Sequence, residues 1–130
     1  MMITTKGRNA LKIMIDLARH EGEGFISLAD VAERQKESLK YLEASAAQLS
    51  AAGLVVSARG KSGGYKLSKA PEEYTAFEIL QVGEGTLSPV QCLISGCENA
   101  AFCDTLPLFK ELDEVIMGFL NSKTLKDLII

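Results

Sequence analysis

The chain has three cysteines, Cys92, Cys97 and Cys103, and all of them lie within one stretch of twelve residues. Four residues separate the first two and five separate the last two. Thiolates are soft ligands that select iron–sulfur clusters, zinc or copper(I). The spacing departs from the paired cysteines of structural zinc sites and from the tighter four-cysteine runs of ferredoxins. We therefore predict a site with three thiolate ligands and one coordination position left to a weak, exchangeable or partner-supplied ligand.

The alternative is that the cysteines bind nothing, because a free cysteine often packs as a small hydrophobic side chain. Three thiols in a polar, glycine-containing stretch make this alternative the weaker one. The single histidine, His20, lies far away in the sequence. We interpret it as an ordinary residue at a helix C-terminus, where a partial positive charge is favourable.

The segment ahead of the cysteines has the pattern of a helix-turn-helix followed by a β-hairpin. Apolar spacing and capping residues predict helices over residues 6–20, 28–34 and 39–52, with Thr5, Ser27 and Ser38 as N-caps. Two β-like runs, 54–59 and 65–68, flank a glycine-rich stretch from Gly60 to Gly64 that is typical of a hairpin turn. A very short strand is expected at Phe25-Ile26. Together these elements predict a winged helix-turn-helix.

The rest of the chain is predicted to contain one short helix, an irregular segment and one longer helix. Thr75 caps the short helix, which ends near Val82, and the irregular segment contains all three cysteines. A helix over residues 107–120 follows, and Ser122 is expected to cap a short final helix. The longer helix carries an apolar stripe that is too extensive to be left exposed, at Phe109, Leu112, Ile116 and Phe119. The fold class is therefore mainly α (α+β).

The winged helix predicts which residues meet DNA. The second helix of the pair enters the major groove by its N-terminal end, which here presents Ser38, Lys40, Tyr41 and Glu43. Long cations at the hairpin tip, Arg59 and Lys61, would reach the minor groove, and Lys6 and Arg8 would add backbone contacts. Two alternatives stay open: the same pattern is also that of a small α+β core with solvated charges, and winged helices also serve as protein-interaction modules.

Charge is distributed unevenly along the chain. Residues 1–70 contain eleven Lys and Arg against seven Asp and Glu, whereas residues 71–130 contain three against ten. The first part therefore carries +4 and the second −7, so only the first part favours a polyanion. No signal peptide or membrane-spanning run is apparent, and we expect a cytoplasmic protein with reduced thiols. No nucleophile–base pair, phosphate loop or clustered histidine predicts an enzyme.

Several stretches match known regulators in order along almost the whole chain. They are Thr5-Lys6-Gly7-Arg8, Leu28-Ala29-Asp30-Val31-Ala32-Glu33, Tyr41-Leu42-Glu43, Gly53-Leu54-Val55, Arg59-Gly60-Lys61-Ser62-Gly63-Gly64-Tyr65, the three cysteines, and Gly118-Phe119-Leu120. On these residues the chain resembles the IscR/NsrR winged-helix regulators of the Rrf-two superfamily. The wing and the cysteine segment are the most specific part of this resemblance.

The resemblance implies a homodimer built on the long helix and an iron–sulfur cluster on Cys92, Cys97 and Cys103. It implies a winged helix-turn-helix over residues 1–82, a cluster-binding loop over 83–104, and a dimerisation helix with a short final helix over 105–130. In the assembly regulators of this family a histidine shortly after the third cysteine is the fourth ligand, and the stretch Asp104-Thr105-Leu106-Pro107 has none. The nitric-oxide sensors can use an aspartate near the N-terminus of the partner subunit, where this chain has Arg8. Both [2Fe–2S] and [4Fe–4S] clusters stay open.

The sequence therefore predicts a homodimeric transcription regulator that binds promoter DNA. It would sense iron–sulfur status, nitric oxide or redox state through the three cysteines. The first alternative is a winged-helix repressor with a thiol-redox or zinc switch and no cluster. The second is a winged-helix adaptor or cluster-delivery protein that does not bind DNA.

Overall fold

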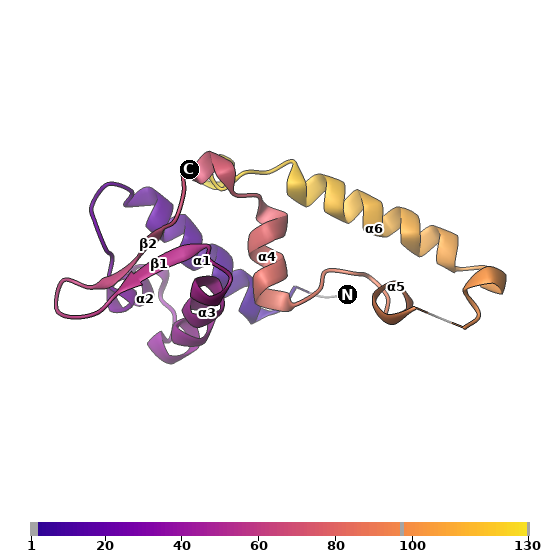
Figure 1. The fold of residues 1–130 in the computed structure, drawn as a ribbon, viewed down its shortest axis with the longest axis horizontal. Coiled ribbons are helices and arrows are strands. Elements are labelled where there is room, and N and C mark those ends of the chain that lie inside the picture. Colours follow the sequence, from indigo (N-terminus) through magenta and orange to yellow (C-terminus); the bar gives the residue numbers. More distant parts are fainter. Residues whose placement is uncertain (1–2, 97, 130) are drawn as a thin grey trace.

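The computed structural model describes residues 3–96 and 98–129. Its elements in chain order are α1 (Thr5–Arg19), α2 (Leu28–Gln35), α3 (Leu39–Ala51), β1 (Val55–Ala58), β2 (Gly64–Leu67), η1 (Pro71–Glu73), α4 (Ala76–Glu84), α5 (Cys92–Ser95), η2 (Ala100–Phe102), α6 (Leu106–Asn121) and η3 (Lys126–Leu128). Figure 1 shows α1, α2 and α3 gathered at one end with the β1–β2 hairpin, and α6 as a long helix beyond α4. The predicted mainly α fold with a winged helix-turn-helix is confirmed.

Side-chain caps explain where most helices begin. The Ser27 hydroxyl accepts a hydrogen bond from the Asp30 amide, and the Thr75 hydroxyl accepts one from the Glu78 amide, so α2 and α4 start as predicted. Helix α1 begins one residue earlier than predicted, because its cap is Thr4 and not Thr5. Ser38 occupies the cap position of α3 but makes no side-chain cap bond.

The prediction that Ser122 starts a final helix is wrong. Ser122 ends α6 instead, because its hydroxyl donates to the Phe119 carbonyl at 2.6 Å. The last turn, η3, is held by a reciprocal pair of bonds between Thr124 and Asp127. Each residue's amide donates to the other's side-chain oxygen, so this pair supplies the cap that was predicted at Ser122.

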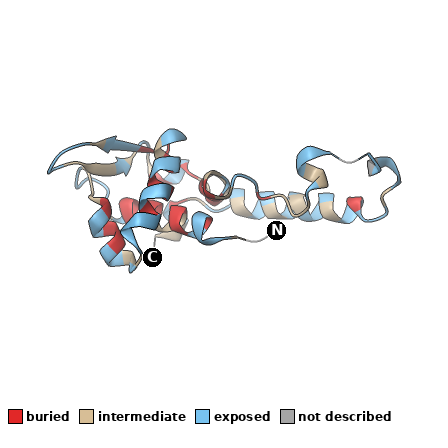
Figure 2. Ribbon diagram, turned by 90° about the horizontal axis from the view of Figure 1, so that it is seen from below, coloured by how far each residue is buried: buried red, intermediate tan, exposed pale blue. Residues whose placement is uncertain are grey.

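The hydrophobic core surrounds α1, which contacts α2, α3, α4 and β2. Its largest fully buried side chains are Tyr74, Ile13, Met14, Leu17, Leu42, Leu49, Ile79 and Leu125. Figure 2 shows the buried residues concentrated in this part of the molecule. Burying such side chains is the main source of stability for a domain of this size. The winged helix-turn-helix therefore contains most of the hydrophobic core that stabilises the chain.

A buried carboxylate links α1 to the helix-turn-helix. Asp16 is 1% exposed, and its oxygens accept bonds from Arg34 Nη2 at 2.7 Å, from Arg34 Nε at 3.1 Å and from Gln35 Nε2 at 3.3 Å. The bond to Asp16 raises the pKa of Arg34, so the guanidinium stays protonated. A buried carboxylate without partners would be costly, so α2 is held in one position against α1.

The wing is a two-stranded antiparallel sheet in which Val55 pairs with Leu67 and Ala58 with Gly64. The predicted strand at Phe25-Ile26 is reduced to a single bridge. Ile26 and Tyr65 exchange two backbone hydrogen bonds of 2.8 Å. This bridge attaches β2 to the loop before α2, so the hairpin has a defined position relative to the helix pair.

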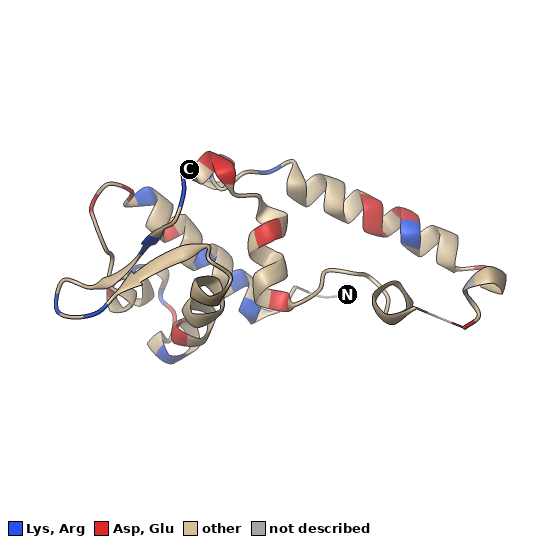
Figure 3. Ribbon diagram, in the orientation of Figure 1, with Lys and Arg blue, Asp and Glu red and all other residues tan. Residues whose placement is uncertain are grey.

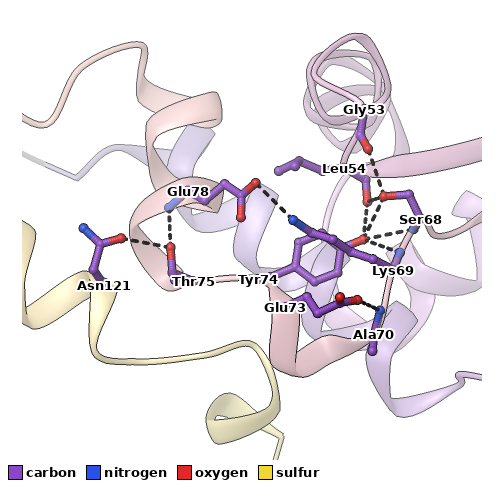
Figure 4. A network of polar contacts seen from close by, with 10 residues as sticks. All are labelled: Gly53, Leu54, Ser68, Lys69, Ala70, Glu73, Tyr74, Thr75, Glu78 and Asn121. Atoms are coloured by element: carbon purple, nitrogen blue, oxygen red, sulfur yellow. Dashed lines mark hydrogen bonds and ion pairs between the residues drawn. The ribbon is translucent and has the colours of Figure 1, made fainter.

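A second polar network, around the Tyr74 hydroxyl, fixes the base of the wing (Figure 4). This fully buried hydroxyl donates to the Leu54 carbonyl at 2.7 Å and accepts from the amides of Ser68 and Lys69. Lys69 also lies over the Tyr74 ring, with 4.9 Å from Nζ to the ring centroid. The network joins the ends of both strands to the segment that leads into α4.

Helix α6 projects away from the core (Figures 1 and 2). Leu106 is its only buried residue among those that the structure describes, and the exposed fraction is 64% at Leu108, 63% at Val115 and 59% at Phe119. Part of its surface faces α4, where an apolar hollow of about 320 Å³ opens, lined by Ile3, Leu80, Val115, Ile116, Phe119 and Leu120. One chain alone therefore leaves the apolar stripe of α6 largely exposed.

Candidate nucleic-acid interface and cysteine site

The N-terminal end of α3 presents the residues that the sequence predicted for the major groove. Ser38, Lys40, Tyr41 and Glu43 are all exposed, and the exposed fraction of Tyr41 is 64%. The opposite face of α3 is buried through Leu42, Ser45, Ala46 and Leu49. The helix therefore separates a packed face from a polar face in the way that a recognition helix requires.

The turn before α3 contains a backbone conformation that is unusual for a side-chain-bearing residue. Lys36 caps α2 in the left-handed conformation, with φ 55° and ψ 46°. The Glu37 amide donates to the Ala32 carbonyl at 3.0 Å, and the Glu37 carboxylate pairs with Lys12 of α1. These contacts hold the turn against α1 and offset the strain of the left-handed residue.

The tip of the wing carries the predicted cations Arg59 and Lys61, both exposed. Lys6 and Arg8, at the start of α1, are exposed as well. Within the described part of the chain, none of these four cations nor Lys40 has an ion-pair partner. Figure 3 shows Lys and Arg mainly at the helix-turn-helix and wing end, while Asp and Glu mark α4 and α6. The cations are therefore free to meet an anionic partner.

Two of the predicted contact residues, Lys6 and Tyr41, line one hollow between α1 and α3. This hollow has a volume of about 540 Å³, and its other lining residues are Thr5, Asn9, Ala44, Ser45 and Gln48. Sequence reasoning missed Asn9, Ser45 and Gln48. The available signal was a polar residue, Asn9, next to the apolar positions of the first helix. In the structure Asn9 is only 2% exposed, and its Oδ1 has no hydrogen-bond partner among the described residues.

The cysteine segment connects α4 to α6 and is less irregular than predicted. Cys92 begins the one-turn helix α5, and Cys103 follows the turn η2. Both thiols are free and half-buried. Cys97 lies outside the described residues. Among residues 3–96 and 98–129 no three potential ligands lie together, so the predicted set of three, which includes Cys97, stays a prediction.

Cys103 has a local environment that favours the thiolate. The Thr105 hydroxyl lies 3.3 Å from its Sγ. This hydrogen bond, followed by those from the backbone amides of Thr105 and Leu106, lowers the pKa of the Cys103 thiol. Thiolate is the form that binds metals and attacks electrophiles, so Cys103 is prepared for either role.

Comparison with known proteins identifies the family. The model of the Rrf2 family, described as an iron-dependent transcriptional regulator, matches residues 3–130. The regulator IscR of Serratia proteamaculans (strain 568) is 40% identical over 130 residues, which are 99% of this chain and 79% of that protein. The chain belongs to the Rrf2 family. The predicted family is thus confirmed, and an Rrf2 protein of this kind is a DNA-binding regulator of transcription and not an enzyme.

Solved structures of related regulators have the same fold. CymR (YrzC), the global cysteine regulator of B. subtilis, superposes with a TM-score of 0.82 at 41% identity, over 98% of this chain and 95% of that one. IscR from T. potens superposes with a TM-score of 0.80 at 38% identity, over 98% and 85%. The Rrf2 likeness therefore includes the cysteine segment and α6 as well as the winged helix. In the described part of this Rrf2 chain no helix has the length and apolarity to cross a bilayer.

The contact between Thr105 and Cys103 yields a test in the metal-free Rrf2 protein. Thr105→Val removes the hydroxyl but keeps the backbone amide, so we expect the pKa of Cys103 to rise. A lowered pKa gives more thiolate at neutral pH, and the variant should therefore be alkylated more slowly there. Its rate-against-pH curve should move to higher pH.

The measurement is the rate of iodoacetamide labelling of the Cys103 peptide between pH 6 and 10, followed by mass spectrometry. Helix α6 should be unaffected, because Thr105 makes no side-chain cap bond. Thr105→Ser, which keeps a hydroxyl, is the matched control. Identical curves for wild type and Thr105→Val would contradict the assigned cause.

Proposed function

We propose that this Rrf2 protein is a homodimeric regulator that binds promoter DNA and senses iron–sulfur status, nitric oxide or redox state through a cluster held by its cysteines. One observation carries the proposal. The segment with all the cysteines joins α4, which packs on the DNA-binding core through α1, to α6, which has an unpaired apolar stripe. A change in that segment acts on both neighbours.

DNA binding would use the polar face of α3, the wing tip and the start of α1. Lys40 and Glu43 meet base edges or phosphate in the major groove, and Ser38 and Tyr41 donate to phosphate. Arg59 and Lys61 reach the minor groove, and Lys6 and Arg8 bind the backbone. The absence of competing ion pairs on the described cations supports these roles, since no intramolecular partner has to be displaced.

Dimerisation would bury the stripe of α6. Leu112, Val115 and Phe119 have exposed fractions between 42% and 63%, and Phe109 and Ile116 lie beside them on the same helix. An apolar face of this extent on a single helix favours pairing with a second copy of itself. A twofold arrangement of this kind would also present two recognition helices to two half-sites of an operator.

The residues present suit an iron–sulfur cluster by their chemistry. Cys92 and Cys103 are free, half-buried thiols, and the pKa of Cys103 is already lowered by Thr105. Together with Cys97 they would be three soft thiolate ligands. When bound, such a cluster supplies a centre that responds to oxidants, nitric oxide and iron supply.

The switch would be a shift between two arrangements of the chain. In one arrangement the thiolates would be drawn together as ligands and residues 85–104 would be ordered. In the other arrangement the thiolates would be released and the same segment would take a different conformation. Since α4 and α6 are its two neighbours, the segment changes how the two helices pack. The DNA-binding surfaces of the two protomers then take a different spacing, and operator affinity changes.

A second candidate is a thiol-redox regulator without a cluster. The lowered pKa of Cys103 favours it, because a reactive thiolate is oxidised readily. One solved relative, CymR, is a regulator of cysteine by name. Anaerobic reconstitution with iron and sulfide separates the two candidates.

DNA binding predicts that Arg59→Ala weakens binding to an operator. Removing a specific interaction in the groove should cost about 1–3 kcal/mol, which is about 5- to 150-fold in Kd. Fluorescence anisotropy with duplexes from the region upstream of the protein's own gene measures this, after footprinting has located the site. Lys110→Ala, which removes an exposed cation of α6, is the control and should bind as wild type does. Equal weakening in both variants would contradict a specific role for the wing.

Dimerisation predicts that Val115→Glu produces monomers. The new carboxylate would lie beside Leu112 and Phe119, three and four residues away on α6, in the surface that dimerisation buries, where desolvation without a partner is costly. Sedimentation equilibrium measures the mass, and circular dichroism checks that the helices remain. Lys110→Glu adds a carboxylate on the other side of α6 and should stay dimeric. A dimeric Val115→Glu protein would place the interface elsewhere.

The cluster predicts visible absorption after anaerobic reconstitution with iron and sulfide. We expect a sulfide-to-iron charge-transfer band in the wild type and its loss in Cys103→Ala, because one of three thiolate ligands is gone. Mössbauer spectroscopy then distinguishes [2Fe–2S] from [4Fe–4S]. A wild-type protein without the band, and with zinc or disulfide found by metal and thiol analysis, would favour the second candidate instead.

A further inference from the structure

The start of α1 is held by a single carboxylate from the end of α4. Glu84 Oε2 accepts hydrogen bonds from the Thr4 amide at 2.7 Å and from the Gly7 amide at 3.0 Å. The Thr4 hydroxyl lies 2.8 Å from Glu84 Oε1 and 2.9 Å from Oε2. The same hydroxyl accepts from the Lys6 amide at 3.2 Å. Glu84 therefore satisfies amides that a helix N-terminus otherwise leaves without partners.

Two glycines make this contact possible. A Cβ on Gly7 would lie 2.5 Å from Glu84 Oε2, so an alanine there and the carboxylate cannot occupy the same place. A Cβ on Gly83 would lie 2.8 Å from the Gly7 Cα and 2.9 Å from the Lys6 carbonyl oxygen. The backbones of α1 and α4 thus touch at this point, and the absence of a side chain on Gly7 leaves the space that the Glu84 carboxylate occupies.

The clamp formed by Glu84, Thr4 and Gly7 holds the turn that contains Lys6, one of the proposed DNA-contacting residues. Lys6 lies between the two clamped residues and lines the hollow it shares with Tyr41 of α3. Arg8 follows the clamp directly. No described salt bridge orients either cation, so the backbone position of this turn sets the place from which both side chains extend.

We propose that Glu84 is a positioning residue for DNA binding, which sets the start of α1 so that Lys6 and Arg8 meet the DNA backbone. This inference rests on the proposed DNA-binding function. The negative charge of Glu84 by itself repels the DNA phosphates. Removing its charge would strengthen binding if the charge alone mattered, whereas removing its clamp weakens binding. The two effects have opposite signs.

The test is Glu84→Gln in the full-length protein, measured with the footprinted operator duplex at several salt concentrations. An amide keeps the size of the side chain but accepts through one oxygen only. Affinity should fall by about tenfold at 0.1 M salt for each phosphate that the variant no longer binds, and the slope of log K against log salt should decrease by about 0.9 for each. A purely structural role would lower the thermal midpoint and leave the salt slope unchanged.

A second variant disrupts the contact between Glu84 and α1 by a change on α1. Gly7→Ala displaces the carboxylate, because its Cβ would lie 2.5 Å from Glu84 Oε2. Alanine is a better helix former than glycine, which offsets part of the lost contact, and circular dichroism checks that the helices remain. We expect the same decrease in affinity and salt slope as for Glu84→Gln. In a Lys6→Ala/Arg8→Ala background, Glu84→Gln should weaken binding little further, because the cations that it positions are already gone.

The matched control is Glu78→Gln, which makes the same charge change on α4 at a carboxylate that pairs with Lys69 at 3.6 Å. It should keep wild-type affinity and slope. If Glu84→Gln and Gly7→Ala bind as the wild type does, or lose affinity with an unchanged slope, the positioning role is overturned. If the wild type itself binds no duplex, the proposed function fails, and that outcome is distinguishable from the others.

Discussion

The structure depends on the direct contact between α1 and α4. The two helices meet backbone to backbone at Gly7 and Gly83, where a side chain on either glycine would collide with its neighbour. This close approach lets Glu84 reach the amides at the start of α1. Because α1 is the centre of the core and α4 also packs against α6, the crossing joins the winged helix-turn-helix to the cysteine segment and α6, which together form an arm.

The arm and the core differ in how they are stabilised. In the core, two buried polar groups are paired: Asp16 with Arg34 and Gln35, and the Tyr74 hydroxyl with the base of the wing. These contacts leave the wing and the helix pair little freedom. The arm has few such contacts, and its one long helix leaves apolar side chains such as Val115 exposed. This division suits the proposed function, in which the DNA-binding surface keeps its shape while its surroundings respond.

Much of the candidate site was predictable from the sequence because local signals are strong there. The cap at Ser27, the apolar face of Leu42 and Leu49 and the glycine-rich hairpin are features of neighbouring residues. The exposure of Lys40 and Arg59 follows from the same periodicity. The sequence was less informative at element ends. Thr4 replaced Thr5 as a cap, because two adjacent threonines offer the same local signal. Ser122 ended a helix that it was expected to precede, because its hydroxyl bonds to the preceding Phe119 carbonyl and not to a following amide.

By itself the sequence determined the order of elements, the mainly α winged helix-turn-helix, the separation of positive and negative charge, and the three thiols in one segment. These follow from periodicity, capping and composition, all of which act over short stretches of chain. Only the tertiary structure decided that Glu84 holds Thr4 and Gly7, that Asn9 faces a hollow beside Tyr41, and that Thr105 acts on Cys103. The first two contacts join residues distant in sequence and the third depends on the shape of one turn, so no spacing rule could reveal them.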